Sequence, residues 1–472
     1  MQAKLDSALN KTSQDEETDV FNSLKDELEA DSEKFFHAFI IPSYKEEAET
    51  LGETLQQLAD HSDAKKRYLV FMAMEAHEEG SIEKAKGLIA KFGNNFKVMS
   101  YSHHVIKEHE AKGKASNVSW CGEHLEENEF KKHGISPDKV FVTVIDADSW
   151  VPEFYVKEMD DHIAAHPSDC HDYTYQPCQV FSRNWTDVPA LARVYDQLHT
   201  EAQMSNIVSL DKQGVAISNY TMSFNMLKEI GFWDTCADAI GEDLHTFIKA
   251  SFKTNGRIKT QPIFVPFGQL NVQTDKGYFA GIMARFWQAE RHARGCADYA
   301  YVLNFLFRKD RPAMTFRTMK VVYMALELFM LPAFVPWCAM GFWISQYLMA
   351  HGYTEMTPNM VPDEWLSLLM AIGGWGMTAG WFVCFFFNKW GSKLYYNLDM
   401  SLWRIIELPV LILPILFTMT TPTFVIASFK IWLGKNDYNV AEKAVKHDYN
   451  YQAHQAIAQN VEESTNDSKV AL

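Results

Sequence analysis

Two carboxylates, Asp146 and Asp148, follow an unbroken run of β-branched and aromatic residues that begins at Val140. Such a run predicts a buried strand, and residues two apart on a strand point to the same face of a sheet. Both carboxylates would then converge on one oxygen-loving divalent cation, and that cation could grip a diphosphate. An isolated Asp-x-Asp also occurs as a simple polar turn after a strand, because Asp favours turns. The choice between a cation site and a simple polar turn depends on the other reactive residues of the chain.

A second acidic pair, Glu242 and Asp243, stands where residues 239–246 predict the start of a helix. A carboxylate there can act as the general base for an attacking hydroxyl. Acids also occur at helix starts merely because they complement the helix dipole. Lys114 lies in a Gly-containing loop before another predicted helix, where its ammonium group either binds phosphate or stays solvated. Together with Asp146 and Asp148, these residues favour a catalytic role for the acids over a merely structural one.

Strands and helices that would position these groups alternate along the first half of the chain. Strands are expected at 35–41, 67–74, 96–101 and 140–146, with helices at 46–60, at 81–92 and from 112 onward. This order predicts an α/β fold with a mainly parallel sheet and helices on both faces. Beyond it, we expect strands at 176–181 and 216–222 around a helix at 187–210.

The carboxyl ends of the predicted parallel strands carry polar residues. Ligands of such sheets bind outside this edge. Ser43 to Glu46 follow the first strand, Glu75 follows the second and Asp146 follows the fourth. The adjacent His103 and His104 are not spaced as metal ligands on one helix face, and we interpret them as surface or packing residues.

An ordered series of short motifs resembles the family 2 glycosyltransferases. The series runs through Ile41-Pro-Ser-Tyr-Lys-Glu46, Glu75, Lys114 with Asn117, Asp146-Ala-Asp148, Gly241-Glu-Asp243 and Gln288-Ala-Glu-Arg-His292. The likeness covers residues 35–300 and is nearest the membrane-embedded branch of cellulose, chitin and hyaluronan synthases. It implies a Rossmann-like GT-A catalytic domain followed by C-terminal transmembrane helices. The implied activity is inverting transfer of a hexose from a UDP-sugar to a polysaccharide or lipid acceptor.

The resemblance also implies a role for each matching residue. Nucleotide-sugar binding falls to Ser43, Tyr44, Glu46, Glu75, Lys114 and Asp146. Mg²⁺ or Mn²⁺ is implied at Asp148 with Asp146, and Asp243, beside Glu242, would be the general base. The acceptor would meet the departing diphosphate at Gln288, Arg291 and His292.

Two positions depart from the family pattern. Glu75 stands in place of the usual Asp, and Glu78 or Glu79 remain alternative ligands. His292 replaces the Trp of Gln-x-x-Arg-Trp, which puts polymer processivity and the acceptor in doubt. One alternative is therefore a non-processive glycolipid glycosyltransferase, and another is a membrane scaffold that keeps the fold without turnover. Retention of the Asp146, Asp148 and Asp243 set argues against the scaffold.

Composition divides the chain and excludes some partners. Residues 1–34 predict an acidic disordered tail and 435–472 a polar tail. The formal net charge of −16 disfavours nucleic acid as a partner. The seven cysteines are scattered and predict neither a disulfide framework nor a zinc site.

Three apolar runs, 321–350, 365–387 and 405–432, are each long enough to cross a bilayer. We therefore expect a multi-pass region at 321–434 after a basic interfacial linker at 301–320. Basic flanks place the catalytic domain in the cytosol, at the plasma membrane, Golgi or endoplasmic reticulum. The third run either crosses once or re-enters as a hairpin, and Glu407 at its edge is expected to snorkel to the interface. Three crossings are few for a polymer pore, so we expect a compact relative, an oligomer or a sequence whose N-terminus is incomplete.

Overall fold

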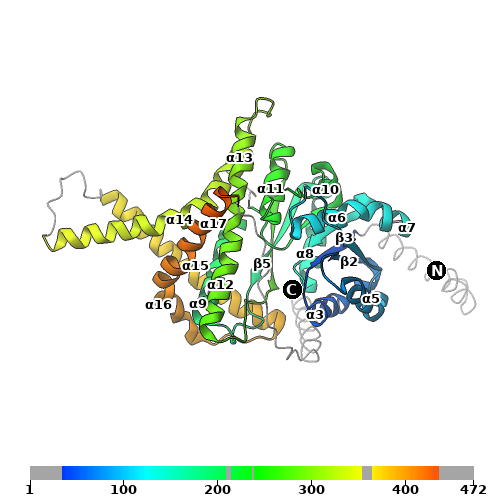
Figure 1. The fold of residues 1–472 in the computed structure, drawn as a ribbon, viewed down its shortest axis with the longest axis horizontal. Helices are drawn as coiled ribbons and strands as arrows, with labels where there is room; N and C mark the ends of the chain where they lie inside the picture. Colours follow the sequence, from blue (N-terminus) through cyan, green and yellow to red (C-terminus); the bar gives the residue numbers. More distant parts are fainter. Residues whose placement is uncertain (1–34, 209–213, 237–238, 353–363, 435–472) are drawn as a thin grey trace, which may run out of the picture.

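The computed structural model describes residues 35–208, 214–236, 239–352 and 364–434 (Figure 1). The two predicted tails, 1–34 and 435–472, lie outside the described residues. The described part contains a sheet flanked by helices, from which further helices of the C-terminal half extend to one side (Figure 1).

Seven strands form one mixed sheet in the order β3-β2-β1-β4-β6-β5-β7. The strands are β1 (Phe36–Ser43), β2 (Tyr68–Glu75), β3 (Val98–His104), β4 (Val140–Val144), β5 (Tyr173–Val180), β6 (Tyr220–Ser223) and β7 (Lys259–Gly268). β1 pairs in parallel with β2 and β4, β2 with β3, and β5 with β7. β6 is antiparallel to both β4 and β5. The predicted α/β class is confirmed.

The sequence analysis missed β7. This strand contains Pro262 and Pro266, which lack the N–H needed for a central strand position. It lies at the edge of the sheet, where among the described residues one side of the strand pairs only at Gly268, with Trp150. Proline is tolerated there, and this explains why a prolyl segment that does not look like a strand still forms one.

Helices cover both faces of the sheet and bury alternate residues of each strand. On one face lie α3 (Ala48–Ala59), α5 (Ser81–Phe92) and α8 (Glu153–Ala165). On the other lie α6 (Lys114–Leu125), α10 (Phe224–Ile230) and α11 (Glu242–Lys253). Within β1, Phe39 and Ile41 face the first group whereas Ala38 and Ile40 face the second. Burial on both faces explains the nearly continuous apolar runs of the parallel strands.

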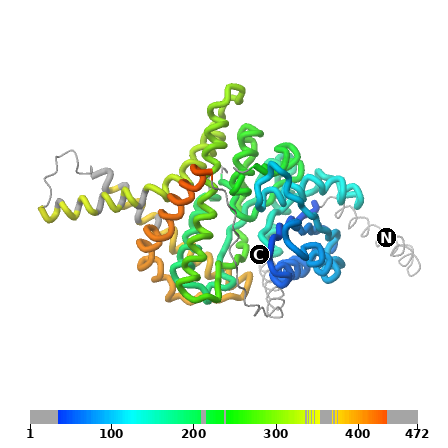
Figure 2. The backbone as a smooth tube through the Cα atoms, in the orientation of Figure 1, coloured from blue at the N-terminus to red at the C-terminus, as the bar shows by residue number. Residues whose placement is uncertain are grey.

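The second half of the chain adds a set of long helices. They are α9 (Ala190–Ile207), α12 (Tyr278–Ala293), α13 (Asp298–Phe307), α14 (Phe316–Ala350), α15 (Glu364–Tyr396), α16 (Glu407–Ile415) and α17 (Thr421–Trp432). The first half also contains two short helices, α4 (Ala64–Arg67) and α7 (Lys131–His133). α17 packs along α12 and α14, and α9 packs against α15 and α16 (Figure 2). The C-terminal helices are thereby joined to the helices that flank the sheet.

One helix among the described residues, Leu402–Trp432, is long and apolar enough to cross a membrane. It covers the third predicted apolar run as a continuous helical segment with a π-turn at Leu416–Thr420, and not as a re-entrant hairpin. The first two runs fall in α14 and α15, and the described residues do not establish three crossings.

Candidate active site

The residues predicted to bind the donor gather at one edge of the sheet. β1, β2 and β4 are parallel neighbours, so their carboxyl ends point the same way. Ser43 ends β1, Glu75 ends β2, and Asp146 lies two residues after the end of β4. The predicted location at the strand ends is therefore confirmed.

Asp146 and Asp148 belong to a turn after β4, not to the strand itself. The strand ends at Val144, and the N–H of Ser149 donates to the carbonyl of Asp146 at 3.0 Å. The prediction that strand alternation puts both carboxylates on one face is therefore wrong in its geometry. The Asp148 residue is 5% exposed, and its carbonyl oxygen accepts a hydrogen bond from the Arg183 guanidinium.

Lys114, at the start of α6, faces both acidic motifs. Its Nζ lies 3.0 Å from Asp146 Oδ1 and 3.2 Å from Glu242 Oε2. Burial alone would lower the pKa of Lys114, but Asp146, Glu242 and Asp243 together raise it above its usual value. The ammonium group therefore keeps its charge. It lies where the turn after β4, the start of α6 and the start of α11 meet.

Ser218 connects these residues through all of its polar groups. Its hydroxyl donates to Asp146 Oδ2 at 2.6 Å, its N–H donates to Asp243 Oδ2, and its carbonyl accepts from Lys114 Nζ at 2.9 Å. The backbone of Ser218 has φ of 59°, in the left-handed region that a non-glycine residue adopts only rarely. This geometry turns the hydroxyl, the N–H and the carbonyl towards three different partners.

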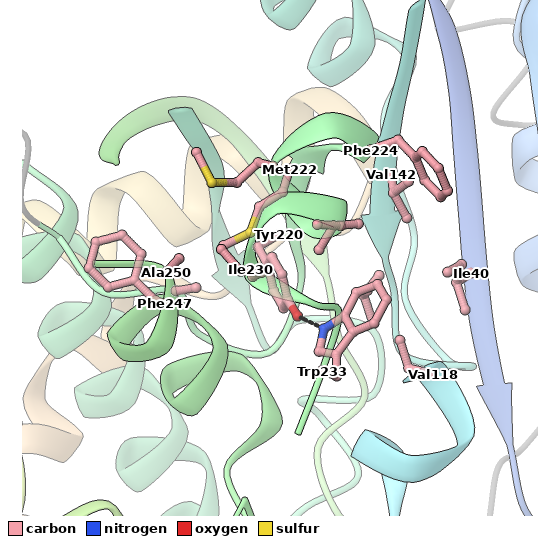
Figure 3. Packing of buried hydrophobic residues seen from close by; sticks show 14 of the residues in the cluster. Ile40, Val118, Val142, Tyr220, Met222, Phe224, Ile230, Trp233, Phe247 and Ala250 are labelled. Atoms are coloured by element: carbon pink, nitrogen blue, oxygen red, sulfur yellow. Dashed lines mark hydrogen bonds between the residues drawn. The ribbon is translucent and has the colours of Figure 1, made fainter. Parts of the chain in front are cut away.

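A buried relay supports Glu242. Trp233 Nε1 donates to the Tyr220 hydroxyl at 2.5 Å (Figure 3). The Tyr220 hydroxyl in turn donates to Glu242 Oε1. Burial raises the pKa of Glu242, whereas Lys114 and the Tyr220 hydrogen bond oppose the shift. Because its Oε1 accepts from the buried Tyr220 and its Oε2 contacts Lys114, Glu242 holds Lys114 and the start of α11 in place.

Asp243 occupies the first turn of α11. Besides the Ser218 N–H, its carboxylate accepts the N–H of Leu244 at 2.9 Å. A Cβ on Gly241, which precedes α11, would lie 3.6 Å from the Cα of Gly295. The start of α11 is therefore in contact with the turn that follows α12.

α12 carries the three residues predicted for the acceptor. Gln288 is 8% exposed, Arg291 is half-buried and His292 is exposed. The ring of His292 lies 6.0 Å from that of His199 on α9. A buried ion pair between Arg285 of α12 and Asp196 of α9, with Nε to Oδ1 at 2.6 Å, fixes the two helices against each other.

Residues after β1 and β2 form the predicted nucleotide end of the site. The N–H of Tyr44 donates to Glu46 Oε2, and Lys84 Nζ contacts Ser43 Oγ at 3.3 Å. Glu78 is bound by Lys84 and by the N–H of Lys45 at 2.8 Å. Its carboxylate is therefore already engaged.

Glu75 differs from Glu78 in having an unused oxygen. The residue is 5% exposed, His104 contacts its Oε1, and its buried Oε2 has no hydrogen-bond partner among the described residues. A buried carboxylate oxygen without a donor is costly unless a ligand supplies one. This favours Glu75 over Glu78 as the residue that meets the nucleotide.

Comparison with protein families shows which family the chain belongs to. A sequence profile described as glycosyl transferase family group 2 matches residues 141–419, more than half of the chain. The chain belongs to this family. It is accordingly a glycosyltransferase, and the matched region extends from β4 through Asp146, Asp243 and α12 into the C-terminal helices.

Several solved structures of glycosyltransferases are distantly similar, whereas no curated protein sequence matches the chain. The mannosyltransferase of Pyrobaculum calidifontis, in complex with GDP-mannose and Mn²⁺, is 13% identical over 86% of this chain and 89% of its own, with a TM-score of 0.49. Residues 1–349 of S. aureus TarS are 12% identical over 86% and 93%, with a TM-score of 0.35. Glucosyl-3-phosphoglycerate synthase of Mycobacterium tuberculosis, with Mg²⁺ and UDP, is 14% identical over 56% and 82%, with a TM-score of 0.31.

The carboxylates of this glycosyltransferase suit a hard divalent cation. The described residues contain no cluster of three or more His, Cys, Asp or Glu side chains placed to hold a metal. Asp146 and Asp148 offer only oxygen donors, and Mg²⁺ is commonly held by one or two carboxylates together with substrate phosphates. The pair therefore fits such an ion provided that the donor diphosphate completes its coordination.

Sequence reasoning found the acids of the site but missed the residues that join them. Ser218 and Tyr220 fell within a segment interpreted as a strand from 216 to 222, whereas β6 begins only at Tyr220. The available signal was the polar Ser218-Asn219 pair between two apolar stretches. Asn219 is fully buried, and its Oδ1 accepts the N–H of Asp146 at 2.7 Å.

Proposed function

We propose that the chain is a membrane-bound, inverting glycosyltransferase of the branch that contains cellulose, chitin and hyaluronan synthases. It moves a hexose from a UDP-sugar to a polysaccharide or lipid acceptor, with a divalent cation and Asp243 as the general base. The observation that carries the proposal is the contact of Ser218 with Asp146, Asp243 and Lys114. Ser218 contacts both the predicted base, Asp243, and the two residues predicted to face the diphosphate, Asp146 and Lys114. These three residues come from three separate segments of the chain.

The reaction we propose is a single displacement. Asp243 takes the proton of the acceptor hydroxyl, and the hydroxyl oxygen of the acceptor forms a bond to the anomeric carbon of the donor sugar. The bond from that carbon to the diphosphate breaks on the opposite side, so the configuration inverts and UDP leaves with the electron pair. Lys114 and Arg291 provide positive charge towards the departing diphosphate. A cation held by Asp148 with Asp146 would supply further stabilisation of the same charge.

We further propose that several C-terminal helices are embedded in the membrane. Besides the candidate span Leu402–Trp432, large apolar side chains are exposed on the neighbouring helices, including Trp337 of α14 and Trp375 of α15. Exposed apolar surface of this kind is typical of contact with lipid or with another protein. We propose that the catalytic domain lies in the cytosol, at the plasma membrane, Golgi or endoplasmic reticulum, and the basic residues of the linker at 301–320 support the cytosolic side.

One observation favours a non-processive glycolipid glycosyltransferase as the second candidate. His292 stands where processive relatives stack a Trp on the acceptor sugar, and its side chain is exposed next to His199. An exposed imidazole offers less stacking surface to a growing polymer than an indole does.

Product analysis with the purified full-length chain tests the proposal and separates the candidates. The protein in detergent, with native lipid added back, is incubated with Mg²⁺ or Mn²⁺ and a panel of radiolabelled UDP-sugars. A ladder of products supports a processive polysaccharide synthase, and one lipid-soluble species supports the glycolipid enzyme. Failure to turn over any donor would contradict both.

A further inference from the structure

A buried histidine lies directly behind the proposed nucleotide carboxylate. His104 is the last residue of β3, pairs in register with Glu75 of β2, and is fully buried. Its Nδ1 lies 3.1 Å from Glu75 Oε1 and its Nε2 lies 3.0 Å from Glu110 Oε2. His104 is thus buried, as expected of a packing residue, and both of its ring nitrogens in addition face carboxylates.

The charged groups around His104 come from every segment packed on it. Glu75 belongs to β2, and Glu110 belongs to the loop before α6. In that loop Lys107 binds Glu110 through its N–H, at 2.9 Å, and through its Nζ, 3.4 Å from Glu110 Oε1. From α6, the uncharged ring of Trp120 lies 5.9 Å from the imidazole. The two glutamates thus outnumber the one lysine near the ring.

This arrangement favours the imidazolium form of His104. Burial alone would lower the pKa of His104, but hydrogen bonds to Glu75 and Glu110 outweigh burial and raise it above its usual value. Only the protonated ring donates from both nitrogens. A neutral ring would leave one nitrogen lone pair facing a carboxylate oxygen at about 3 Å, which is repulsive.

We infer that His104 is a positioning residue for donor binding: its Nδ1–H holds Glu75 Oε1 while its Nε2–H is held by Glu110, which leaves Glu75 Oε2 to accept one N–H or O–H of the donor nucleoside. The inference rests on the proposed function, because it deepens the nucleotide role of Glu75. Glu75 Oε2 is the buried oxygen without a partner, and it lies at the same sheet edge as Ser43 and Asp146. His104 itself does not touch the ligand.

The inference predicts a donor affinity that depends on pH. As pH rises through the raised pKa of His104, the clamp on Glu75 is lost and the donor KM rises, whereas kcat stays within about twofold. Glu110→Gln removes one of the two charges that hold the proton, so the same change in affinity should occur at lower pH. If His104 had a purely structural role, Glu110→Gln would not change the pH at which the donor affinity falls.

The experiment measures binding of UDP with Mn²⁺ to the full-length chain by calorimetry between pH 6 and 9, with steady-state KM and kcat beside it. The control is His133→Gln, which changes an exposed histidine of α7. We expect His104→Gln to weaken UDP binding about tenfold, equivalent to about 1.4 kcal/mol, and to abolish its pH dependence. If 2′-deoxy-UDP shows the same penalty, the partner of Glu75 is the base or the ribose 3′ hydroxyl, and if the penalty disappears it is the ribose 2′ hydroxyl.

Two results would overturn the inference and are distinguishable. If UDP binds well and both His104→Gln and Glu110→Gln keep the wild-type affinity and pH profile, His104 does not position Glu75, and the proposed function stands. If neither the wild type nor the control binds a nucleoside diphosphate, the proposed function fails and the inference fails with it.

Discussion

Ser218 shows how much of this site depends on one residue without a recognisable motif. Acids and lysines can be identified from their type and spacing, and Asp146, Asp243 and Lys114 were identified in that way. The contacts of Ser218 depend on its backbone φ of 59°, which nothing in the sequence indicates for a serine. The donors and acceptors of a site are therefore more predictable than the residues that orient them.

Ser218→Ala tests this orienting role. The substitution removes the hydroxyl that donates to Asp146, at 2.6 Å, and leaves both backbone contacts in place. Hydrogen bonds to charged groups contribute about 1.5–3 kcal/mol, so we expect kcat/KM for the donor to fall at least about tenfold. This value of kcat/KM is measured from initial rates over a range of donor concentrations. The control Ser205→Ala changes an exposed serine and should keep the wild-type value. An unchanged kcat/KM in Ser218→Ala would show that the Ser218 hydroxyl does not orient the site.

α11 carries the proposed base, and a buried histidine holds this helix in place. His245 Nδ1 contacts Asp298 Oδ1 at 2.6 Å, and its Nε2 contacts Asp234 Oδ2 at 3.0 Å. Burial opposes protonation, but the two aspartates prevail and raise the pKa of His245 to about 9. Asp234 also binds Lys249 one turn further along α11. These contacts tie the helix to α13 and to the loop after α10.

The raised pKa predicts how stability depends on pH. A histidine whose pKa is higher in the folded state stabilises that state fully below its unfolded pKa of 6.5, and this contribution is lost as pH rises through about 9. We expect the wild type to lose about 3 kcal/mol of unfolding free energy over this interval from His245. His245→Gln should be less stable at pH 6.5 and should show a flatter profile. Unfolding in detergent is compared with His77→Gln, an exposed control, and equal slopes in all three proteins would refute the assignment.

The joint between the sheet domain and the C-terminal helices contains another buried ion pair. Arg193 of α9 contacts Glu407 of α16 through two bonds, of 2.7 and 3.0 Å, and Arg404 approaches the same carboxylate at 3.3 Å. The expectation that Glu407 snorkels to the membrane interface is therefore wrong. Sequence reasoning could not anticipate the partner, because the two residues are far apart in the chain.

Glu407→Gln should weaken this joint. Removing one partner of a buried pair leaves the Arg193 charge uncompensated, which costs about 3–5 kcal/mol. We expect a lower unfolding temperature in detergent and faster proteolytic cleavage between the two parts. Glu127→Gln breaks an exposed pair with Lys131 and should cost less than about 1 kcal/mol. Equal effects of the two substitutions would show that Glu407 does not hold the joint.

In the chain as a whole, the secondary structure of the first half was easier to predict from the sequence than the helix packing of the second half. The parallel strands and their helices were located from the sequence because local apolar patterns reflect burial on both faces. Strand β7 was missed because of its prolines, and Asp146 was assigned to a strand that ends at Val144. The packing of α12 and α9 against the C-terminal helices rests on contacts between distant residues, such as Arg285 with Asp196, which local patterns do not encode.

Membrane embedding is a property of the entire chain and has its own test. The continuous apolar helix Leu402–Trp432 and the exposed apolar residues of α14 and α15 predict an integral protein. The chain should remain in the membrane pellet after extraction with alkaline carbonate and should dissolve in detergent. Release into the supernatant by carbonate alone would contradict the proposed membrane region.

The most direct test of the account is UDP release by the purified full-length chain with Mg²⁺ or Mn²⁺, compared with Asp243→Asn. A general base contributes about 10²–10⁴-fold to the rate, so the substitution should reduce release by at least about 100-fold. Asp138→Asn, which alters an exposed aspartate outside the site, should retain the wild-type rate. Release from one UDP-sugar that requires the metal and is lost in Asp243→Asn is the predicted result. A wild-type rate in Asp243→Asn would contradict the account, because the site would then work without its proposed base.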